Sequence, residues 1–283
     1  MAPRFALPVR LPITRTFRAP ARFNSNTSSS RAARVIEMAA QAEKPSALEA
    51  GVPVMWAVCG GLIFTAWGRI GERDGSENVE KVLDAFHKII EFTKPHEPDV
   101  LRYVVTLPAE DTTGTVLYMI EEYASQAASD AHLATQPVQD LIKLFTTTSV
   151  LAQPPEVHTS TVAASKPCSP PPSISTSPAI VLAHFDYKPK TVAHALQGWT
   201  DVVDYVSKNE YWTRGYTVGE EKETNSVRTV ETYESWDFLE KVHMKSEAIA
   251  KNREHNGKDR VGQGAVRVVA VDGYLGREGK AKL

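Results

Sequence analysis

One phrase of the sequence occurs twice, and this repeat constrains the fold more than any other feature. Ile-Glu-Glu-Tyr-Ala-Ser stands at 120–125, and Val-Glu-Thr-Tyr-Glu-Ser stands at 230–235. Each phrase predicts the end of a strand, a serine cap, and a short helix that carries a histidine, His132 or His243. Serine suits the cap because its hydroxyl accepts a hydrogen bond from a free N–H of the first helical turn. Two such copies indicate an internal duplication.

The segments around these phrases follow one order in both parts of the chain. Apolar residues recur at i, i+3, i+4, i+7, i+10 and i+11 from Val79 and again from Val192, which predicts two amphipathic helices. Apolar runs bounded by turn residues predict the strands on either side. Each part therefore predicts strand, helix, strand, strand, helix, strand, the order of a ferredoxin-like unit with helices on one face of an antiparallel sheet.

A single sheet of this kind leaves one face open, and a second copy, packed sheet on sheet, covers it most economically. The predicted fold class is therefore α+β, with two ferredoxin-like βαββαβ repeats forming an intramolecular pseudo-dimer. We expect the repeats at 62–158 and 179–276, with 146–158 as the last strand of the first repeat. A Pro- and Ser-rich linker should join them at 159–178, and 277–283 should form a solvated tail.

The first 50 residues have the composition of a targeting segment. Arginines recur from Arg4 to Arg34 before the first acidic residue, Glu37, and serines cluster at 28–30. An Arg-rich, Ser-rich and acid-poor start is typical of a mitochondrial transit peptide. We therefore expect residues 1–50 to be disordered and the protein to be mitochondrial. The alternative is a basic tail on a cytoplasmic protein.

Residues 51–68 carry no charge and approach the length of about 18 residues that a membrane helix requires. However, Gly60 and Gly61 interrupt this stretch, and the repeat requires a strand at 62–70. We favour a strand preceded by an apolar lead-in at 51–61. A membrane tether is the alternative.

Charge and cysteine content exclude several classes of function. A net charge of -2 gives no basic surface of the kind that binds nucleic acid. The two cysteines lie far apart in unlike contexts, which argues against a disulfide scaffold or a Cys-based zinc site. The histidines show no metal-binding spacing, and no glycine-rich phosphate loop precedes a helix.

Three marks occur in order in the first repeat: Glu-Pro before a strand at 97–103, Glu–aromatic–x–Ser within 120–125, and Ala-His within 131–135. On these residues the chain resembles the antibiotic biosynthesis monooxygenase family of dimeric α+β barrels. The second repeat matches with a longer tyrosine-to-histidine spacing, and no Glu-Pro precedes its strand at Tyr211. Its matching residues are Glu231, Tyr233, Ser235 and His243.

The resemblance implies a pocket between each helix layer and its sheet, where a flat aromatic substrate binds. Oxygenases of this kind deprotonate a phenolic substrate, and the carbanion reacts directly with dioxygen without a metal or cofactor. This chemistry requires a base, a hydrogen-bond donor for the oxyanion, and a dry cavity. The implied partners are a small aromatic or polyketide-like substrate and dioxygen. A chain that closes its own pseudo-dimer is expected to be a monomer or a weak dimer.

His132 is the candidate base because histidine titrates near neutral pH, with Tyr103 and Tyr123 as candidate donors. His243 is the corresponding candidate in the second repeat. The alternative is that these histidines bond to a neighbouring strand and that the tyrosines are core rings. In that case the barrel binds or scaffolds without catalysis.

Trp67 and His184 stand at corresponding positions on the first strand of each repeat, and Trp212 begins a later strand. We expect these three residues and Tyr233 to contact the substrate, although Trp67 could equally fill the core. Glu121 and Glu231 are expected on a rim or in ion pairs, the usual place of carboxylates on strands. Arg214 is expected to be a solvated charge.

Overall fold

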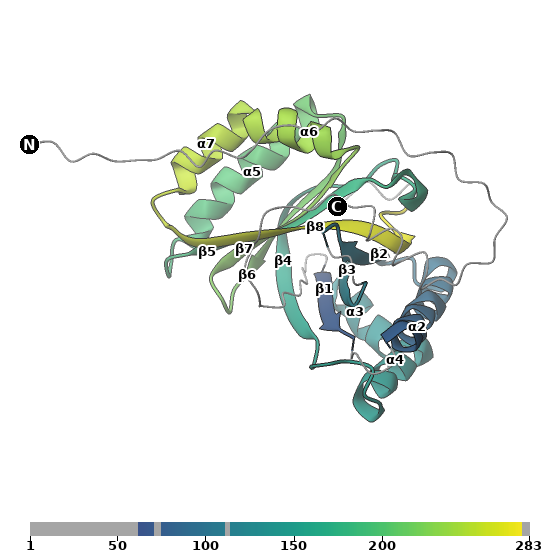
Figure 1. Ribbon diagram of the computed structural model, residues 1–283. Coiled ribbons are helices and arrows are strands. Elements are labelled where there is room, and N and C mark those ends of the chain that lie inside the picture. Colours follow the sequence, from purple (N-terminus) through teal and green to yellow (C-terminus); the bar gives the residue numbers. More distant parts are fainter. Residues whose placement is uncertain (1–61, 71–74, 111–113, 279–283) are drawn as a thin grey trace, which may run out of the picture.

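The computed structural model describes residues 62–70, 75–110 and 114–278 (Figure 1). The expected transit peptide at 1–50, the apolar lead-in at 51–61 and most of the tail lie outside these ranges. Leu62–Arg69 forms strand β1, as predicted, and not the second half of a membrane helix. Within the described ranges, no helix combines the length and the apolar character that a membrane span requires.

The first half of the described chain follows the predicted order, with its second helix divided into two pieces. The stripe that begins at Val79 lies on the first helix, where Val82, Phe86 and Ile89 are buried with it. After β1 come α2 (Gly75–His96), β2 (Val100–Pro108), β3 (Val116–Tyr123), α3 (Gln126–Leu133), α4 (Gln136–Thr147) and β4 (Glu156–Lys166).

The second half repeats this order after a short 3-10 turn, η1 (Ile174–Thr176). The stripe that begins at Val192 again forms the buried face of the first helix. The elements are β5 (Ala179–Tyr187), α5 (Val192–Asn209), β6 (Thr213–Glu221), β7 (Ser226–Tyr233), α6 (Trp236–Lys241), η2 (His243–Lys245), α7 (Glu247–Asn256) and β8 (Arg260–Tyr274).

The strands form one closed barrel in the order β1-β3-β2-β8-β5-β7-β6-β4, and β4 pairs back with β1. Strands of the two halves meet at two seams, where β2 pairs with β8 and β4 pairs with β6, both antiparallel. The two sheets therefore also join edge to edge, which the sequence analysis did not predict, while their inner faces pack on each other inside the barrel. Edge pairing satisfies the backbone N–H and C=O groups that an open edge would leave without partners.

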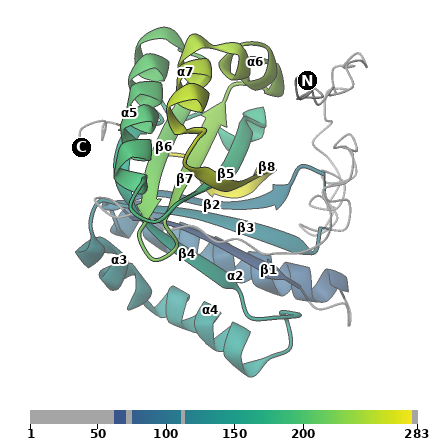
Figure 2. The same ribbon diagram turned by 90° about the vertical axis from the view of Figure 1, so that its left-hand side faces the viewer.

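Helices cover the barrel on two sides, with α2, α3 and α4 over one half and α5, α6 and α7 over the other (Figure 2). One apolar core lies under each helix layer. Residues that alternate with these helix-facing positions point into the barrel and form a third core. This inner core consists of Val104, Ile120, Ile180, Leu182, Val230, Val268, Ala270 and Leu275.

The strand predicted at 146–158 lies later in the chain. Thr146 and Thr147 complete α4, and their hydroxyls donate to carbonyls one turn back at Ile142 and Lys143. Prolines at 154–155 cannot donate to a ladder, so β4 begins only after them. The strand then runs to Lys166, so residues 159–166 of the expected linker belong to β4, and this part of the strand pairs with β6.

Candidate active site

The repeated phrase positions its side chains through a strand end and a helix start. β3 ends at Tyr123, and Ser125 caps α3 by accepting a hydrogen bond from the Ala128 N–H at 3.2 Å. In the second copy Ser235 occupies the cap position of α6 but makes no such side-chain bond. His243 lies on η2, beyond the end of α6, which accounts for the longer spacing in the sequence.

His132 lies at the centre of the first cluster, which comprises His132, Glu97, Tyr103, Tyr123 and Glu121. Its Nδ1 is 2.9 Å from Glu97 Oε2, and its ring centroid is 5.4 Å from that of each tyrosine. The Tyr123 hydroxyl donates to Glu121 Oε2 at 2.6 Å, and Tyr103 also hydrogen-bonds to Glu121. His132 and Tyr103 are each 1% exposed and Tyr123 is 0% exposed, whereas Glu97 and Glu121 are partly exposed.

The surroundings assign different charges to the groups of the first cluster. Burial opposes the charged form of Glu97, but hydrogen bonds from His132 and Thr93 and the charge of Arg277 prevail and lower its pKa. Burial and the nearby Glu121 carboxyl raise the pKa of Tyr103 and of Tyr123 well above the usual range. The cluster thus holds a carboxylate on the histidine and two neutral phenols.

A second cluster with the same geometry lies in the other half and comprises His243, Glu210, Tyr216, Tyr233 and Glu231. His243 Nδ1 is 2.9 Å from Glu210 Oε2. The His243 ring centroid is 5.4 Å from that of Tyr216 and 5.2 Å from that of Tyr233. The Tyr233 hydroxyl donates to Glu231 Oε2 at 2.8 Å.

Electrostatics in the second cluster follow the same pattern. Burial favours a higher pKa for Glu210, but hydrogen bonds from His243 and Thr213 and the charge of Lys166 outweigh it and lower the pKa. Burial and the Glu231 carboxyl raise the pKa of Tyr216 and of Tyr233 well above the usual range.

Sequence reasoning missed the carboxylate partners of both histidines. The sequence marks Glu97 only as part of the Glu-Pro motif, and it does not mark Glu210 because no Glu-Pro precedes Tyr211. One sequence feature could have pointed to these two glutamates, because each has a threonine within four residues. The hydroxyls of Thr93 and Thr213 donate to Glu97 and Glu210, respectively, at 2.8 Å. Tyr216, the counterpart of Tyr103, was also missed.

The sequence analysis expects Glu121 and Glu231 on a rim or in ion pairs, but the structure places both carboxyls beside tyrosine hydroxyls. Glu121 is the direct cross-strand neighbour of Tyr103, and Glu231 is that of Tyr216. Both carboxyls face the helix layer and accept hydrogen bonds from tyrosine hydroxyls. Arg214, by contrast, does lie near the surface, paired with Glu234 at 3.1 Å.

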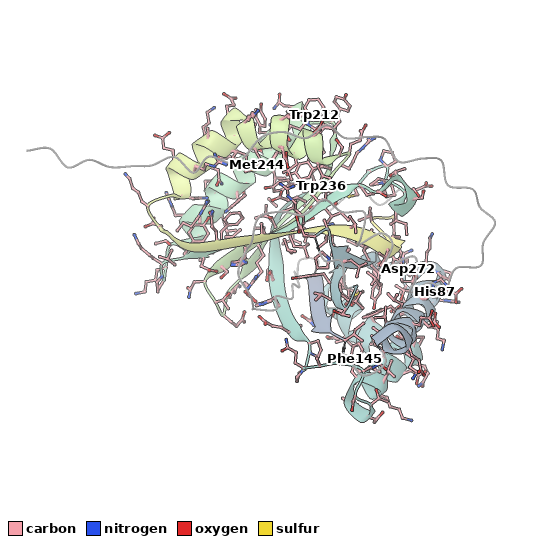
Figure 3. All side chains as sticks on the ribbon, viewed as in Figure 1. His87, Phe145, Trp212, Trp236, Met244 and Asp272 are labelled. Atoms are coloured by element: carbon pink, nitrogen blue, oxygen red, sulfur yellow. The ribbon has the colours of Figure 1, made fainter. Side chains whose placement is uncertain are left out.

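The other candidate contact residues are not gathered around the histidines. Trp67 lies on β1 beside Tyr118, but its side chain falls outside the described part of the structure. His184 lies beside Arg228 on β7, and burial together with the Arg228 charge lowers its pKa. Trp212 stacks on Phe238 at 5.3 Å on the outer side of the second half (Figure 3). Of the four residues expected to contact substrate, Tyr233 alone belongs to a cluster described here.

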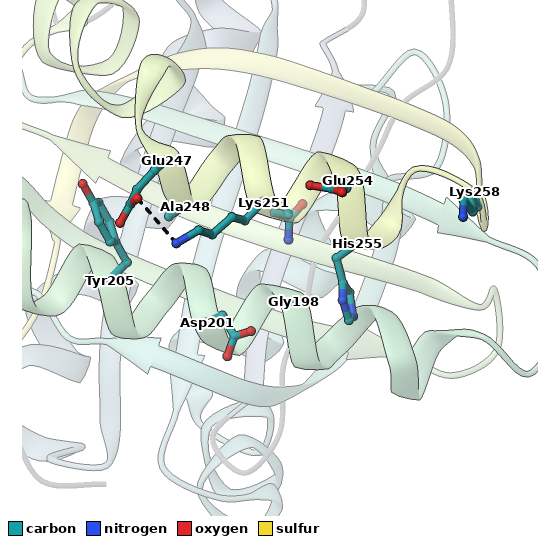
Figure 4. Close-up of a pocket in the computed structure, with 10 residues that line it drawn as sticks. Gly198, Asp201, Tyr205, Glu247, Ala248, Lys251, Glu254, His255 and Lys258 are labelled. Atoms are coloured by element: carbon teal, nitrogen blue, oxygen red, sulfur yellow. Dashed lines mark ion pairs between the residues drawn. The ribbon is translucent and has the colours of Figure 1, made fainter.

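A groove of about 630 Å³ lies between α5 and α7 (Figure 4). Its lining mixes apolar surface with charged and polar side chains such as Asp201, Lys251 and His255, and it contains no residue of either cluster. The groove is therefore not a binding site for a substrate of His132 or His243. Within the described ranges, no group of three or more His, Cys, Asp or Glu side chains is arranged to hold a metal ion.

Comparison with known proteins finds one family model that is similar to the part of the chain around the first cluster. Residues 75–144 match the family model described as antibiotic biosynthesis monooxygenase. This match spans α2 to α4 and includes Glu97, Tyr103, Glu121, Tyr123 and His132. No curated protein matches the chain.

Several solved structures are similar to the whole barrel. A monooxygenase candidate from Lactobacillus acidophilus NCFM is 15% identical with a TM-score of 0.62, covering 76% of this chain and 96% of its own. A monooxygenase candidate from Fusobacterium nucleatum subsp. nucleatum is 14% identical with a TM-score of 0.65, covering 80% and 97%. An anthrone oxidase-like protein is 12% identical with a TM-score of 0.53, covering 80% and 100%. At these identities the likeness shows the fold alone.

Proposed function

Starting from the match of residues 75–144 to the antibiotic biosynthesis monooxygenase family, we propose that this chain is a cofactor-independent monooxygenase of the quinone-forming type. Its substrate is a small aromatic or polyketide-like phenol, and its second substrate is dioxygen. The observation that carries the proposal is the bond of Glu97 to the buried His132, whose ring lies near two neutral tyrosines.

In this mechanism His132 is the base. A carboxylate on Nδ1 favours the tautomer with the proton on that nitrogen, which leaves the Nε2 lone pair to accept the substrate proton. Glu97 then stabilises the imidazolium that forms, as the aspartate does in a Ser-His-Asp triad. The substrate is left as a carbanion, with its negative charge shared by the phenolic oxygen, ready to react with dioxygen.

Tyr103 and Tyr123 supply the donors for the developing oxyanion. Their raised pKa values keep both phenols protonated, and preorganised donors in a site without water stabilise charge strongly. Because His132 is 1% exposed, substrate access requires α3 to move away from β2 and β3. α3 is only eight residues long, so this displacement disrupts little of the fold.

We further propose that the chain arose by duplication of one ferredoxin-like unit and that its halves act as an intramolecular pseudo-dimer. The equal element order and the two matching clusters support this proposal. The seams β2–β8 and β4–β6 would then stand in for the interface between two subunits.

A non-catalytic barrel is the second candidate function, and the burial of both clusters favours it. His132 and His243 are each 1% exposed, so each Glu–His pair can also serve as a satisfied polar contact within a core. In that case the barrel binds or scaffolds, and loss of a histidine lowers stability without a loss of turnover.

Oxygen uptake with a panel of anthrones and hydroquinols distinguishes the two functions. The His132→Gln variant should lower kcat/KM by about 10²- to 10⁴-fold, the usual contribution of general acid–base catalysis. His243→Gln is the matched variant at the equivalent position, and His96→Gln on the exposed end of α2 is the surface control. If the wild type consumes oxygen and His132→Gln does so equally fast while folded, His132 is not the base. If the wild type consumes none but binds the aromatic compounds, the scaffold function stands.

A further inference from the structure

The two clusters differ at one position that contacts the strand glutamate. Along the helix-facing side of β3 the residues are Met119, Glu121 and Tyr123, and along β7 they are Thr229, Glu231 and Tyr233. The register confirms the equivalence on the neighbouring strands, because Met119 pairs with Val105 and Thr229 pairs with Val218. A thioether therefore replaces a hydroxyl beside an otherwise matching glutamate.

This difference changes the number of hydrogen bonds that each glutamate accepts. Thr229 Oγ1 donates to Glu231 Oε1 at 2.7 Å, in addition to the bonds from Tyr233 and Tyr216. Glu121 accepts from Tyr123 and Tyr103, and Met119 has no donor to offer. Each hydrogen bond to a carboxylate favours its charged form. Glu231 therefore accepts one hydrogen bond that Glu121 lacks.

Charged and titratable groups from several elements face Glu121. They are Tyr103 on β2, Tyr123 on β3, His132 on α3, Glu97 after α2, and Tyr274 on β8. Burial is the largest influence and raises the pKa of Glu121. The bonds from both tyrosines oppose this rise, as does the charge of His132 when its ring is protonated, whereas repulsion by Glu97 adds to it.

We propose that Glu121 is a proton-exchanging carboxyl that switches the first cluster on, while Glu231, held by the additional hydrogen bond from Thr229, is not such a switch. The step is the binding of one proton by the Glu121 carboxylate to give a neutral carboxylic acid. As a carboxylate, Glu121 holds the hydroxyls of Tyr103 and Tyr123. Once protonated, it is a weaker acceptor, and the phenols become free to donate to a substrate oxyanion.

This assignment rests on the proposed function and makes the two halves unequal. Glu121 is a positioning residue, because it acts through the tyrosines and not on the substrate. The first half carries the switchable cluster, and the second keeps Tyr216 and Tyr233 bound to Glu231. Only the first half is then active in oxidation.

Titration of glutamate carboxyls by NMR, with ¹³C-labelled glutamate in the full chain, tests the switch independently of turnover. The wild type should show a buried carboxyl that titrates above exposed glutamates and disappears in Glu121→Gln. The Met119→Thr and Met119→Val variants have side chains of the same shape and differ by one hydroxyl. The Thr variant should titrate at lower pH than the Val variant. Equal midpoints, or a signal that persists in Glu121→Gln, would overturn the proposal.

The second half supplies a further arm in case Met119 variants do not fold. Thr229→Val removes the hydroxyl at constant shape. Its NMR spectrum should show a second glutamate carboxyl that titrates above the exposed glutamates. This second signal should be absent from the double variant Thr229→Val with Glu231→Gln. If Thr229→Val leaves the spectrum unchanged, the Thr229 hydroxyl is not what distinguishes Glu231 from Glu121, and the proposal fails.

The pH profile of oxygen uptake connects the switch to turnover. Because turnover requires protonated Glu121, wild-type kcat/KM should fall as the pH rises through the midpoint at which NMR shows the Glu121 carboxyl to titrate. Glutamine cannot ionise, so Glu121→Gln should lack this fall. A fall retained in Glu121→Gln would refute the switch. Absence of turnover in the wild type would instead refute the proposed function and leave the titration result standing.

Discussion

Replacement of Glu97 by glutamine measures how strongly the carboxylate holds the first cluster together. Glu97 Oε2 accepts from His132 at 2.9 Å and from Thr93 at 2.8 Å, and its side chain is 12% exposed. A hydrogen bond to a charged group contributes about 1.5–3 kcal/mol and a neutral one about 0.5–1.5 kcal/mol. Glutamine keeps an acceptor oxygen but no charge. Two bonds weakened by about 1–1.5 kcal/mol each give an expected loss of about 2–3 kcal/mol.

The pH dependence of this loss is fixed by the pKa of Glu97, which is lowered in the folded chain. A carboxyl with a lowered folded pKa stabilises the fold above its unfolded pKa of about 4.3. That stability is lost as the pH falls through the folded value. Since glutamine does not titrate there, the difference between wild type and Glu97→Gln should be full at pH 5 and shrink toward pH 3.

Urea unfolding followed by circular dichroism, with the free energy extrapolated to water, gives this difference directly. Glu210→Gln is the matched variant, because Glu210 also accepts from a histidine and a threonine. Glu247→Gln removes a surface pair with Lys251 and should cost less than about 1 kcal/mol. A loss at Glu97 below about 1 kcal/mol, or one that is constant from pH 5 to pH 3, would refute the reasoning.

Three further predictions concern the barrel and the leader. Arg102 is buried with Glu122, so Arg102→Met should cost about 3–5 kcal/mol in urea unfolding. Arg102→Met combined with Glu122→Leu should recover most of this loss, and an additive double mutant would contradict the buried pair. A Cβ on Gly215 would collide with the Cys168 thiol, so Gly215→Ala should lower stability by about 1–3 kcal/mol, and Cys168→Gly in the same chain should relieve it. Residues 1–50 fused to a fluorescent protein should direct it to mitochondria, and a diffuse signal would refute the predicted leader.

Local pattern alone was sufficient to predict most of the elements. The apolar stripes on α2 and α5 appear in the sequence because a helix repeats about every 3.6 residues, and both stripes are buried. Ser125 was predicted as a cap and is one. His132 was correctly placed on the short helix after β3, and so was the element order of both halves. These features depend on residues a few positions apart.

Contacts between distant residues were decided only by the tertiary structure. Edge-to-edge closure depends on pairing of β2 with β8 and of β4 with β6, which no local pattern specifies. Glu210 lies far from His243 in the chain, so its role could not be read from spacing.

The sequence by itself predicted the same order of helices and strands in both halves, each with a histidine after the phrase that ends in serine. The tertiary structure decided which carboxylate each histidine meets and how many donors each strand glutamate accepts. The physical reason is that periodicity and capping act within a few turns of chain. Burial and hydrogen bonding at the clusters, by contrast, are set by side chains that meet only when the strands pair and the helices pack over them.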